Sequence, residues 1–302
     1  MRQEGTIRGQ YSVSTSYTSL GMNFSTAAFP DSGPQPNSWA DFWDTTKFPG
    51  KRTMPFCGVL EGDWPLPEAA LLADGIPADK LYPLDIERAV RKLKELAPNV
   101  IWWKNTSQPG QYLVSGEAVM AMDSVGRTNN LIDKGAPVKY VWNGAQTFSS
   151  KWIVAKGDPN YDNAMRFLAF VARPDRQIEL AKLIGYAPIN PRAYETMDPV
   201  AAKRLVTYPD NFKNTFPYDY KWWAANLSKW TEAWSFRFLH RRLRVKGLPP
   251  AGAVNDRQAL IVIQSAQIQR HRNPLQDQDE STALASAIDM FFICSILAEG
   301  PI

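Results

Sequence analysis

Residues 147–190 read TFSSKWIVAKGDPNYDNAMRFLAFVARPDRQIELAKLIGYAPIN, and the rest of the chain is organised around this segment. Its first part, Phe148–Ala155, is a short run with Trp, Ile and Val that ends at a Gly-Asp-Pro turn, which predicts a β-strand. Asp158 is a good N-cap, and Pro159 suits the first helical position, where its missing N–H costs nothing. Apolar residues then recur at helical spacing up to Val171, so a helix is predicted after the strand.

A second helix is predicted directly after the first. Pro174 ends the first helix and can start the second, whose apolar positions lead to Gly185, a left-handed C-cap. Tyr186 follows on a loop that is held by the two helices and closed by Pro188. A rigid scaffold that presents an aromatic side chain on a loop is a common way to build a binding site. Tyr186 is therefore a candidate binding residue.

Strand and helix patterns also fill the chain on both sides of this stretch. Polar and apolar residues alternate over Gln10–Asn23, as in a half-buried strand. Asp85 is the predicted N-cap of an amphipathic helix whose charged face is a solvated surface and not a nucleic-acid patch. Further strands are predicted at Val100–Trp103, Ala118–Met122 and Val138–Trp142, with a turn at Asn143-Gly144, and further helices at Trp39–Trp43 (capped by Ser38), Pro67–Ala73, Gln111–Ser115 and Tyr194–Leu205 (with Asp198-Pro199 at its start).

Composition sets broad limits on function. The chain has 302 residues, of which 44% are hydrophobic and 21% charged, which is ordinary for a globular protein. A net charge of +4 is small for this length and does not indicate nucleic-acid binding. Eleven Trp and eleven Tyr are many. They indicate either a Trp-rich core or an aromatic-lined cleft for a small organic ligand.

The sequence offers few residues suited to binding a metal ion or to catalysis. The two cysteines, Cys57 and Cys294, and the two histidines, His240 and His271, show no metal-ligand spacing. The chain contains no G-x-S-x-G, no phosphate-binding loop, no H-E-x-x-H and no dinucleotide fingerprint. We therefore expect no enzyme activity, no metal and no cofactor.

The ordered series of strand, KGDPN, helix, ARPD, helix and IGYAPIN resembles the second lobe crossing of periplasmic solute-binding proteins of ABC transporters. Within that family the chain is most similar to the spermidine/putrescine-binding type. The resemblance covers roughly Arg8 to Trp234, and its specificity lies in the order of the whole series. Further matching segments are Ser38–Arg52, Ala70–Pro77, Ala89–Trp103, Tyr112–Met122, Gly126-Arg127 and Asp198–Pro209.

The resemblance implies an α/β, two-lobed fold of the periplasmic binding protein type II. Residues 8–150 would form lobe two, and residues 151–238 the mainly helical return half of lobe one. The signal peptide and first part of lobe one would be missing, since MRQEGTIRGQYS holds no apolar run of signal-peptide length. Residues 239–302 match nothing in the family, so this tail is expected to be an added domain, a disordered extension or the product of a frame change.

An irregular segment, Lys51–Leu66, supplies the first candidate ligand contacts. In the polyamine-binding relatives, carboxylates in this region of lobe two meet the amino groups of the ligand by charge-assisted hydrogen bonds. The resemblance therefore implies that Glu61 and Asp63 offer two charges and Trp64 an aromatic face. The alternative is a solvated acidic loop.

Three further candidates are Ser124, Arg127 and Ser150. Ser124 and Arg127 follow a predicted buried strand, and in an open α/β sheet ligands lie beyond the carboxyl ends of strands. Arg127 could pair bidentately with a ligand carboxylate, or form a structural salt bridge. The relatives place an aromatic residue of the cleft near Ser124 and an amine-binding Asp near Ser150. This chain has serine at both positions and so differs from the relatives there. These departures weaken a polyamine assignment and leave open a γ-amino acid or another small cation or zwitterion.

The function that the resemblance implies is the substrate-binding component of an ABC importer, which captures a small polyamine or amino-acid-like cation between two lobes. The closed form would dock on the transmembrane permease subunits. We expect a monomer that binds no nucleic acid and is periplasmic, or cytoplasmic if Met1 is the true start. The alternative is a truncated remnant that no longer binds ligand.

Overall fold

The computed structural model describes residues 12–56 and 64–235. These residues build a mixed, seven-stranded sheet in the order β3-β2-β4-β1-β5-β7, with β6 paired to β1. The pairing is parallel between β2 and its neighbours β3 and β4, and antiparallel between β1 and its partners β4, β5 and β6. The strands are β1 (Val13–Ser25), β2 (Arg52–Pro55), β3 (Val100–Trp103), β4 (Met120–Ser124), β5 (Val138–Trp152), β6 (Ala187–Pro188) and β7 (Thr215–Pro217).

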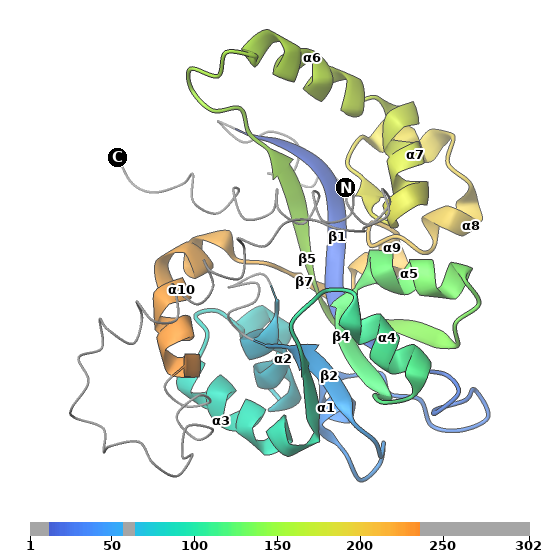
Figure 1. The fold of residues 1–302 in the computed structure, drawn as a ribbon, viewed down its shortest axis with the longest axis vertical. Coiled ribbons are helices and arrows are strands. Elements are labelled where there is room, and N and C mark those ends of the chain that lie inside the picture. The colour runs from blue at the N-terminus through green and yellow to red at the C-terminus, as the bar shows by residue number, and fades with distance from the viewer. Residues whose placement is uncertain (1–11, 57–63, 236–302) are drawn as a thin grey trace, which may run out of the picture. The chain divides into compact units, whose positions relative to one another are not determined.

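Strands β1 and β5 are the longest, with 13 and 15 residues. They pair from Val13 opposite Trp152 to Ser25 opposite Val138, and Figure 1 shows them side by side along this length. The alternating pattern predicted for β1 is confirmed, since its burial alternates over the first residues before the strand becomes fully buried. The first half of β1, before Leu20, and the residues of β5 that pair with it extend beyond the part of the sheet formed by β2, β3 and β4.

The predicted turn at Asn143-Gly144 is wrong. Residues before and after it pair with the same strand, since Val141 lies opposite Met22 and Gln146 opposite Leu20. The residues between them form a bulge in a continuous strand. The strand predicted at 148–155 is the end of β5, which stops at Trp152.

Helices cover the part of the sheet that contains β2, β3 and β4. Two of the predicted N-caps are confirmed: the Ser38 side chain accepts a hydrogen bond from the Asp41 N–H, and that of Asp85 from the Arg88 N–H. The apolar face of the helix after Asp85 is buried, as its amphipathic pattern predicts. These helices are α1 (Trp39–Trp43), α2 (Leu66–Ala73), α3 (Ile86–Leu96), α4 (Gln108–Ser115) and α5 (Val125–Asp133).

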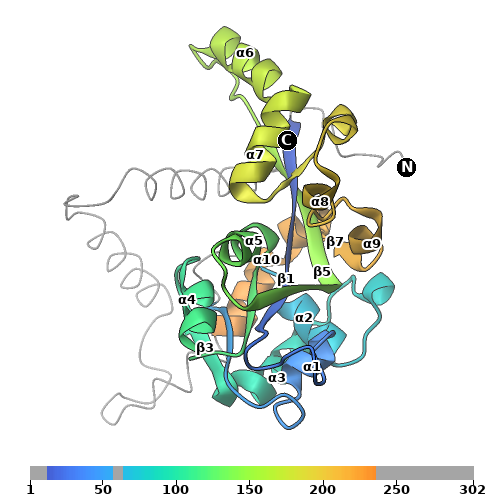
Figure 2. The same cartoon turned by 90° about the vertical axis from the view of Figure 1, so that its right-hand side faces the viewer.

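The segment after β5 forms α6 (Tyr161–Val171), α7 (Pro174–Ile184), α8 (Pro199–Ala202) and α9 (Pro209–Phe212). Figures 1 and 2 show β1 and β5 running from the region of α1–α5 to that of α6 and α7. The left-handed C-cap predicted at Gly185 is confirmed, with φ of 67°. Asp158 does not cap α6, because Asn160 holds the N-cap position and donates its N–H to the Asp158 carboxylate. The long helix predicted at 194–205 is a 3-10 turn followed by α8.

Helix α6 exposes most of its apolar side chains. Only Leu168 of this helix is buried, whereas Tyr161, Met165 and Phe167 are 54%, 42% and 48% exposed. Phe167 packs edge-on against Trp152, with ring centroids 5.6 Å apart, and Phe170 is contacted by two arginines. The described residues thus leave an apolar face of α6 in contact with solvent.

Helix α10 (Tyr220–Trp234) contacts α3, so residues 220–234 pack against the elements predicted as lobe two. Trp223, Trp230 and Trp234 are buried, which agrees with the core interpretation of these aromatics. The described residues up to Trp234 belong to one structural unit, and the proposed lobe boundaries stay a prediction. The tail predicted for 239–302 lies outside the described residues.

Candidate functional site

The parallel strands β2, β3 and β4 end at the same edge of the sheet. Their pairing brings Pro55 beside Trp103, and β4 ends at Ser124. The carboxyl ends of parallel strands are where open α/β sheets bind ligands. This edge therefore places Ser124 and the residues after it in the position expected of a binding site.

Beside this edge, a short stretch of β1 lies between its pairings with β4 and β6. Ser124 of β4 lies opposite Leu20, and Ala187 of β6 lies opposite Tyr17, so Thr18 and Ser19 fall between the two pairings. The Thr18 hydroxyl is buried and has no hydrogen-bond partner among the described residues. The end of β4 and the Tyr186 loop thus flank the same short segment of β1.

The first turn of α5 begins beside this stretch of β1. Ser124 is its N-cap, and its hydroxyl accepts a 3.4 Å hydrogen bond from the Arg127 N–H. The first turn of a helix carries partial positive charge from its unpaired N–H groups. The turn therefore favours anionic groups, and Arg127 adds a cation there that is paired with Asp123.

Arg127 forms the salt bridge that was the alternative interpretation of this residue. Its Nε lies 2.8 Å from the Asp123 carboxylate, which is almost wholly buried. Burial raises the pKa of the Asp123 carboxyl, and the charge and hydrogen bond of Arg127 act against that rise. Removing the arginine would leave a buried carboxyl without its counter-charge.

Trp64 contacts the other side of this arginine. The guanidinium carbon of Arg127 lies 5.6 Å from the centre of the Trp64 ring, which is a cation–π arrangement. Trp64 is itself buried and packs edge-on against Trp103 at 4.7 Å. The structure therefore shows Trp64 as a support for Arg127, and its role as a ligand-stacking face stays a prediction.

Tyr186 lies against the same turn of α5. A side chain at Gly126 would come within 2.8 Å and 3.1 Å of the Cε1 and Cδ1 atoms of the tyrosine. The tyrosine ring is half-buried. Four of the predicted residues, Trp64, Ser124, Arg127 and Tyr186, therefore come together around the start of α5.

The other predicted residues do not join this group. Ser150 lies on β5 opposite Ser16, on the far side of β1 from Ser124, and its hydroxyl is buried with no partner among the described residues. Glu61 and Asp63 lie outside the described residues. Their proposed contacts with a ligand amine stay predictions.

Sequence reasoning missed two features. One is the close approach at Gly126, a residue named above only as part of the matching pair Gly126-Arg127. The other is Glu68, a fully buried carboxyl that accepts hydrogen bonds from Tyr82 and Trp223. A lone Glu within the apolar run LPEAALL was the signal, because an unpaired charge is rarely buried.

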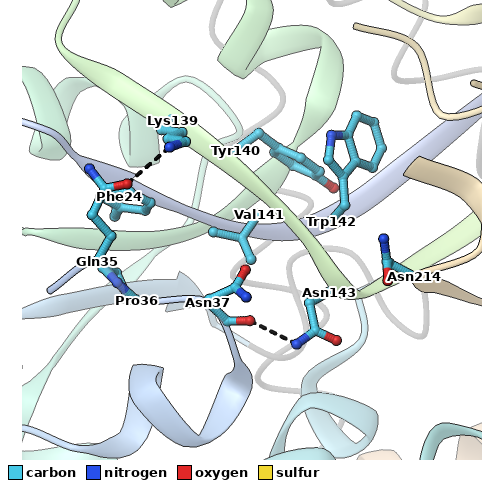
Figure 3. Close-up of a pocket in the computed structure, with 10 residues that line it drawn as sticks. All are labelled: Phe24, Gln35, Pro36, Asn37, Lys139, Tyr140, Val141, Trp142, Asn143 and Asn214. Carbon is cyan, nitrogen blue, oxygen red and sulfur yellow. Dashed lines mark hydrogen bonds between the residues drawn. The ribbon is translucent and has the colours of Figure 1, made fainter. Parts of the chain in front are cut away.

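Separate from these residues is a cavity of about 510 Å³ beside β5. Figure 3 shows the residues that line it, among them Trp142, Asn143 and Asn214, and none of the seven predicted site residues is part of this lining. Lys139 donates to the Gln35 side chain there, and Asn143 to the backbone of Asn37. These contacts tie the loop before α1 to β5.

The described residues hold neither a cluster of metal-ligand side chains nor a membrane-spanning helix. Within 12–56 and 64–235, no group of three or more His, Cys, Asp or Glu residues is placed to hold a metal ion. No helix in the same part of the chain combines the length and apolar character needed to cross a membrane.

Comparison with known proteins gives a family match over residues 3–207, to bacterial extracellular solute-binding proteins. The gamma-aminobutyric acid-binding protein of Pseudomonas aeruginosa is 34% identical over 210 residues, which are 67% of this chain and 58% of that protein. The spermidine/putrescine-binding periplasmic protein of Escherichia coli K12 is 27% identical over 175 residues, 57% of this chain and 48% of that protein. The matched part of the chain thus spans about half the length of these relatives.

A solved structure also resembles this fold. It is an ABC transporter substrate-binding protein from Bradyrhizobium japonicum USDA 110, with a TM-score of 0.70 and 35% identity. The similarity covers 78% of this chain and 73% of that one. The mixed sheet and its helices therefore have the arrangement predicted from the sequence.

Proposed function

Because this chain belongs to the bacterial extracellular solute-binding proteins, we propose that it captures a small amine- or amino-acid-like solute for an ABC importer. The observation that carries the proposal is the meeting of Ser124, Arg127 and Tyr186 at the first turn of α5. This turn lies at the carboxyl edge of the parallel strands, where ligands of α/β sheets bind. Members of the family are binding proteins and not enzymes.

The chemistry of this turn suits a ligand with a carboxylate and an amine. The positive end of α5 favours a carboxylate, and the Arg127 guanidinium, which pairs with Asp123, borders the same turn. The half-buried ring of Tyr186 offers a face to an ammonium group. A zwitterion such as 4-aminobutyrate meets both, and the relative that binds gamma-aminobutyric acid is more similar to this chain than the spermidine/putrescine-binding one.

The finer spermidine/putrescine assignment needs carboxylates that can meet two or more amines. Glu61 and Asp63 could supply them, whereas Ser150 cannot. We therefore place polyamines second to amino-acid-like ligands. The proposed partner is the transmembrane permease of the importer, and the proposed place of action is outside the cytoplasm, as in the family.

A second candidate function is that of a remnant that no longer retains a ligand. The exposed apolar face of α6 favours it, because apolar surface of this kind is normally covered by another element or partner. Binding measurements on the full chain distinguish the two.

The test is a thermal unfolding series of the full chain with 4-aminobutyrate, putrescine and spermidine. A ligand that binds the folded state raises the midpoint by mass action, and at a hundred times its Kd stabilises by about 2.7 kcal/mol. Tyr186→Ala should reduce the shift, while Tyr161→Ala, a matched change at an exposed tyrosine of α6, should leave it intact. The absence of any shift with all three solutes would reject the proposal and favour the remnant.

A further inference from the structure

Two glycines meet where α5 begins and α7 ends. A side chain at Gly126 would overlap the carbonyl oxygen of Ile184, and one at Gly185 would come within 2.9 Å of the Gly126 Cα. Contacts under about 3 Å are essentially never made by real Cβ atoms, so each position excludes any side chain without movement of the backbone. Gly185 also has φ of 67°, a backbone conformation that residues other than Gly and Asn rarely adopt.

The contact between these glycines decides how near Tyr186 comes to the first turn of α5. Tyr186 directly follows Gly185, and its ring lies over Gly126. A methyl group at Gly126 would therefore push the Ile184 carbonyl and the tyrosine ring away from α5 together. The displaced ring would no longer lie against the first turn of α5.

The far end of α5 is fixed independently. Arg204 donates 2.7 Å to the Asp133 carboxylate and 3.1 Å to the Asn129 carbonyl, and the Asn129 side chain donates to the Arg204 carbonyl. These bonds hold the last turns of α5 against the segment after α8. A change at Gly126 would thus alter the first turn while the rest of the helix stays anchored.

We propose that Gly126 is a positioning residue for ligand capture: by having no side chain, it lets Tyr186 close over the first turn of α5. The proposal rests on the function proposed above and adds to it a residue that need not touch the ligand. A glycine that served packing alone would affect stability when replaced, and would leave the position of Tyr186 relative to Arg127 unchanged.

The matched pair of variants is Gly126→Ala and Gly33→Ala. At Gly33 the nearest heavy atom to a new Cβ would be the Pro30 carbonyl oxygen at 3.9 Å, an ordinary contact, so alanine fits there. Calorimetric titration with 4-aminobutyrate and putrescine should give a Kd about tenfold weaker or more for Gly126→Ala and no change for Gly33→Ala. The double variant with Tyr186→Ala should lose no more affinity than Tyr186→Ala alone, because both changes act through one side chain.

A spectroscopic measurement tests the position of the ring without a ligand. Chains labelled with 3-fluorotyrosine give a fluorine resonance for Tyr186, which is assigned by its loss in Tyr186→Phe. This resonance should shift in Gly126→Ala and stay in place in Gly33→Ala. An unchanged resonance in Gly126→Ala, or affinity losses that add in the double variant, would overturn the inference.

The two proposals can fail separately. If the wild-type chain binds neither solute, the proposed function fails, and the fluorine comparison alone decides for or against the positioning of Tyr186. If Gly126→Ala does not fold, Gly185→Asn tests the same contact from the other side, since Asn tolerates positive φ better than other side chains. A Tyr186 resonance in Gly185→Asn identical to that of the wild type would then overturn the inference.

Discussion

The Glu68 carboxylate on α2 accepts a 2.8 Å hydrogen bond from the indole N–H of Trp223 on α10, across 155 positions of sequence. The same carboxylate oxygen accepts a bond of 2.7 Å from the Tyr82 hydroxyl and one of 3.4 Å from the Gln146 side chain. Glu68 is fully buried. One carboxyl group therefore links α2, the loop before α3, strand β5 and helix α10.

Loss of the indole donor should destabilise the fold. Trp223→Phe removes one hydrogen bond to a buried carboxyl group, and a bond of this kind contributes about 2 kcal/mol. The free energy of unfolding, measured with urea, should fall by about that amount. Trp222→Phe is the control, because Trp222 precedes Trp223 on the same helix and makes ring contacts without bonding Glu68. Equal losses in the two variants would show that the bond itself contributes little.

The stability of the chain should depend on pH through Glu68. Burial raises the pKa of this carboxyl from 4.5 to about 7, although the hydrogen bonds from Tyr82 and Trp223 lower it. The folded state therefore binds a proton that the unfolded state has released, and the stabilisation present below about pH 4.5 is lost as the pH rises to about 7.

Glu68→Gln cannot titrate, so the comparison with this variant isolates the effect. Between about pH 4.5 and 7 the wild type should lose up to about 3 kcal/mol relative to Glu68→Gln, as the pKa difference requires. Urea unfolding at several pH values measures both proteins. Parallel pH profiles for the two would contradict a raised pKa at Glu68.

Removal of Arg127 should cost more than removal of a surface cation. Arg127→Ala leaves the buried Asp123 carboxyl without its partner, and breaking a buried pair in this way costs about 3 kcal/mol. Lys47→Ala breaks an exposed pair with Asp41 and should cost less than about 1 kcal/mol. Chemical denaturation gives both values, and similar costs would mean that solvent reaches Asp123.

Polar substitutions on the exposed face of α6 should be tolerated. Tyr161→Gln combined with Met165→Gln changes two side chains that are 54% and 42% exposed, so stability should change by less than about 1 kcal/mol. Leu168→Gln, at the buried position of the same helix, should cost about 3 kcal/mol. The double variant should also bind less of an apolar dye such as anilinonaphthalene sulfonate. Undiminished dye fluorescence would place the exposed apolar surface elsewhere.

The sequence predicted helix ends correctly where the capping interaction joins residues close together in the chain. Ser38, Asp85 and Asp198 cap helices with their own side chains, and Gly185 ends α7 in a left-handed conformation. Each depends on groups within a few positions along the chain. The prediction failed at Asp158, where Asn160, two residues later, begins the helix instead.

Features that depend on distant partners could not be read from the sequence. Gly144 reads as a turn, and only the pairing of both flanking segments with β1 shows that it belongs to a bulge. The same holds for Glu68, whose donors come from three separate elements, and for Arg127, which is contacted by Trp64 from far along the chain. Tyr186 was named from its loop, Ser124 and Arg127 from the end of a strand, and Trp64 from the resemblance. The structure brings these four residues together.

The pairing of β1 with β5 also limits how α6 and α7 can move. A ladder bonded from Val13 and Trp152 to Ser25 and Val138 cannot stretch or slide without breaking many hydrogen bonds at once. It can twist and flex, and its two register shifts are the points where a ribbon of two strands bends most readily. Helices α6 and α7 are therefore joined to the helices around β2, β3 and β4 through a two-stranded ribbon, which can bend at these shifts but cannot slide.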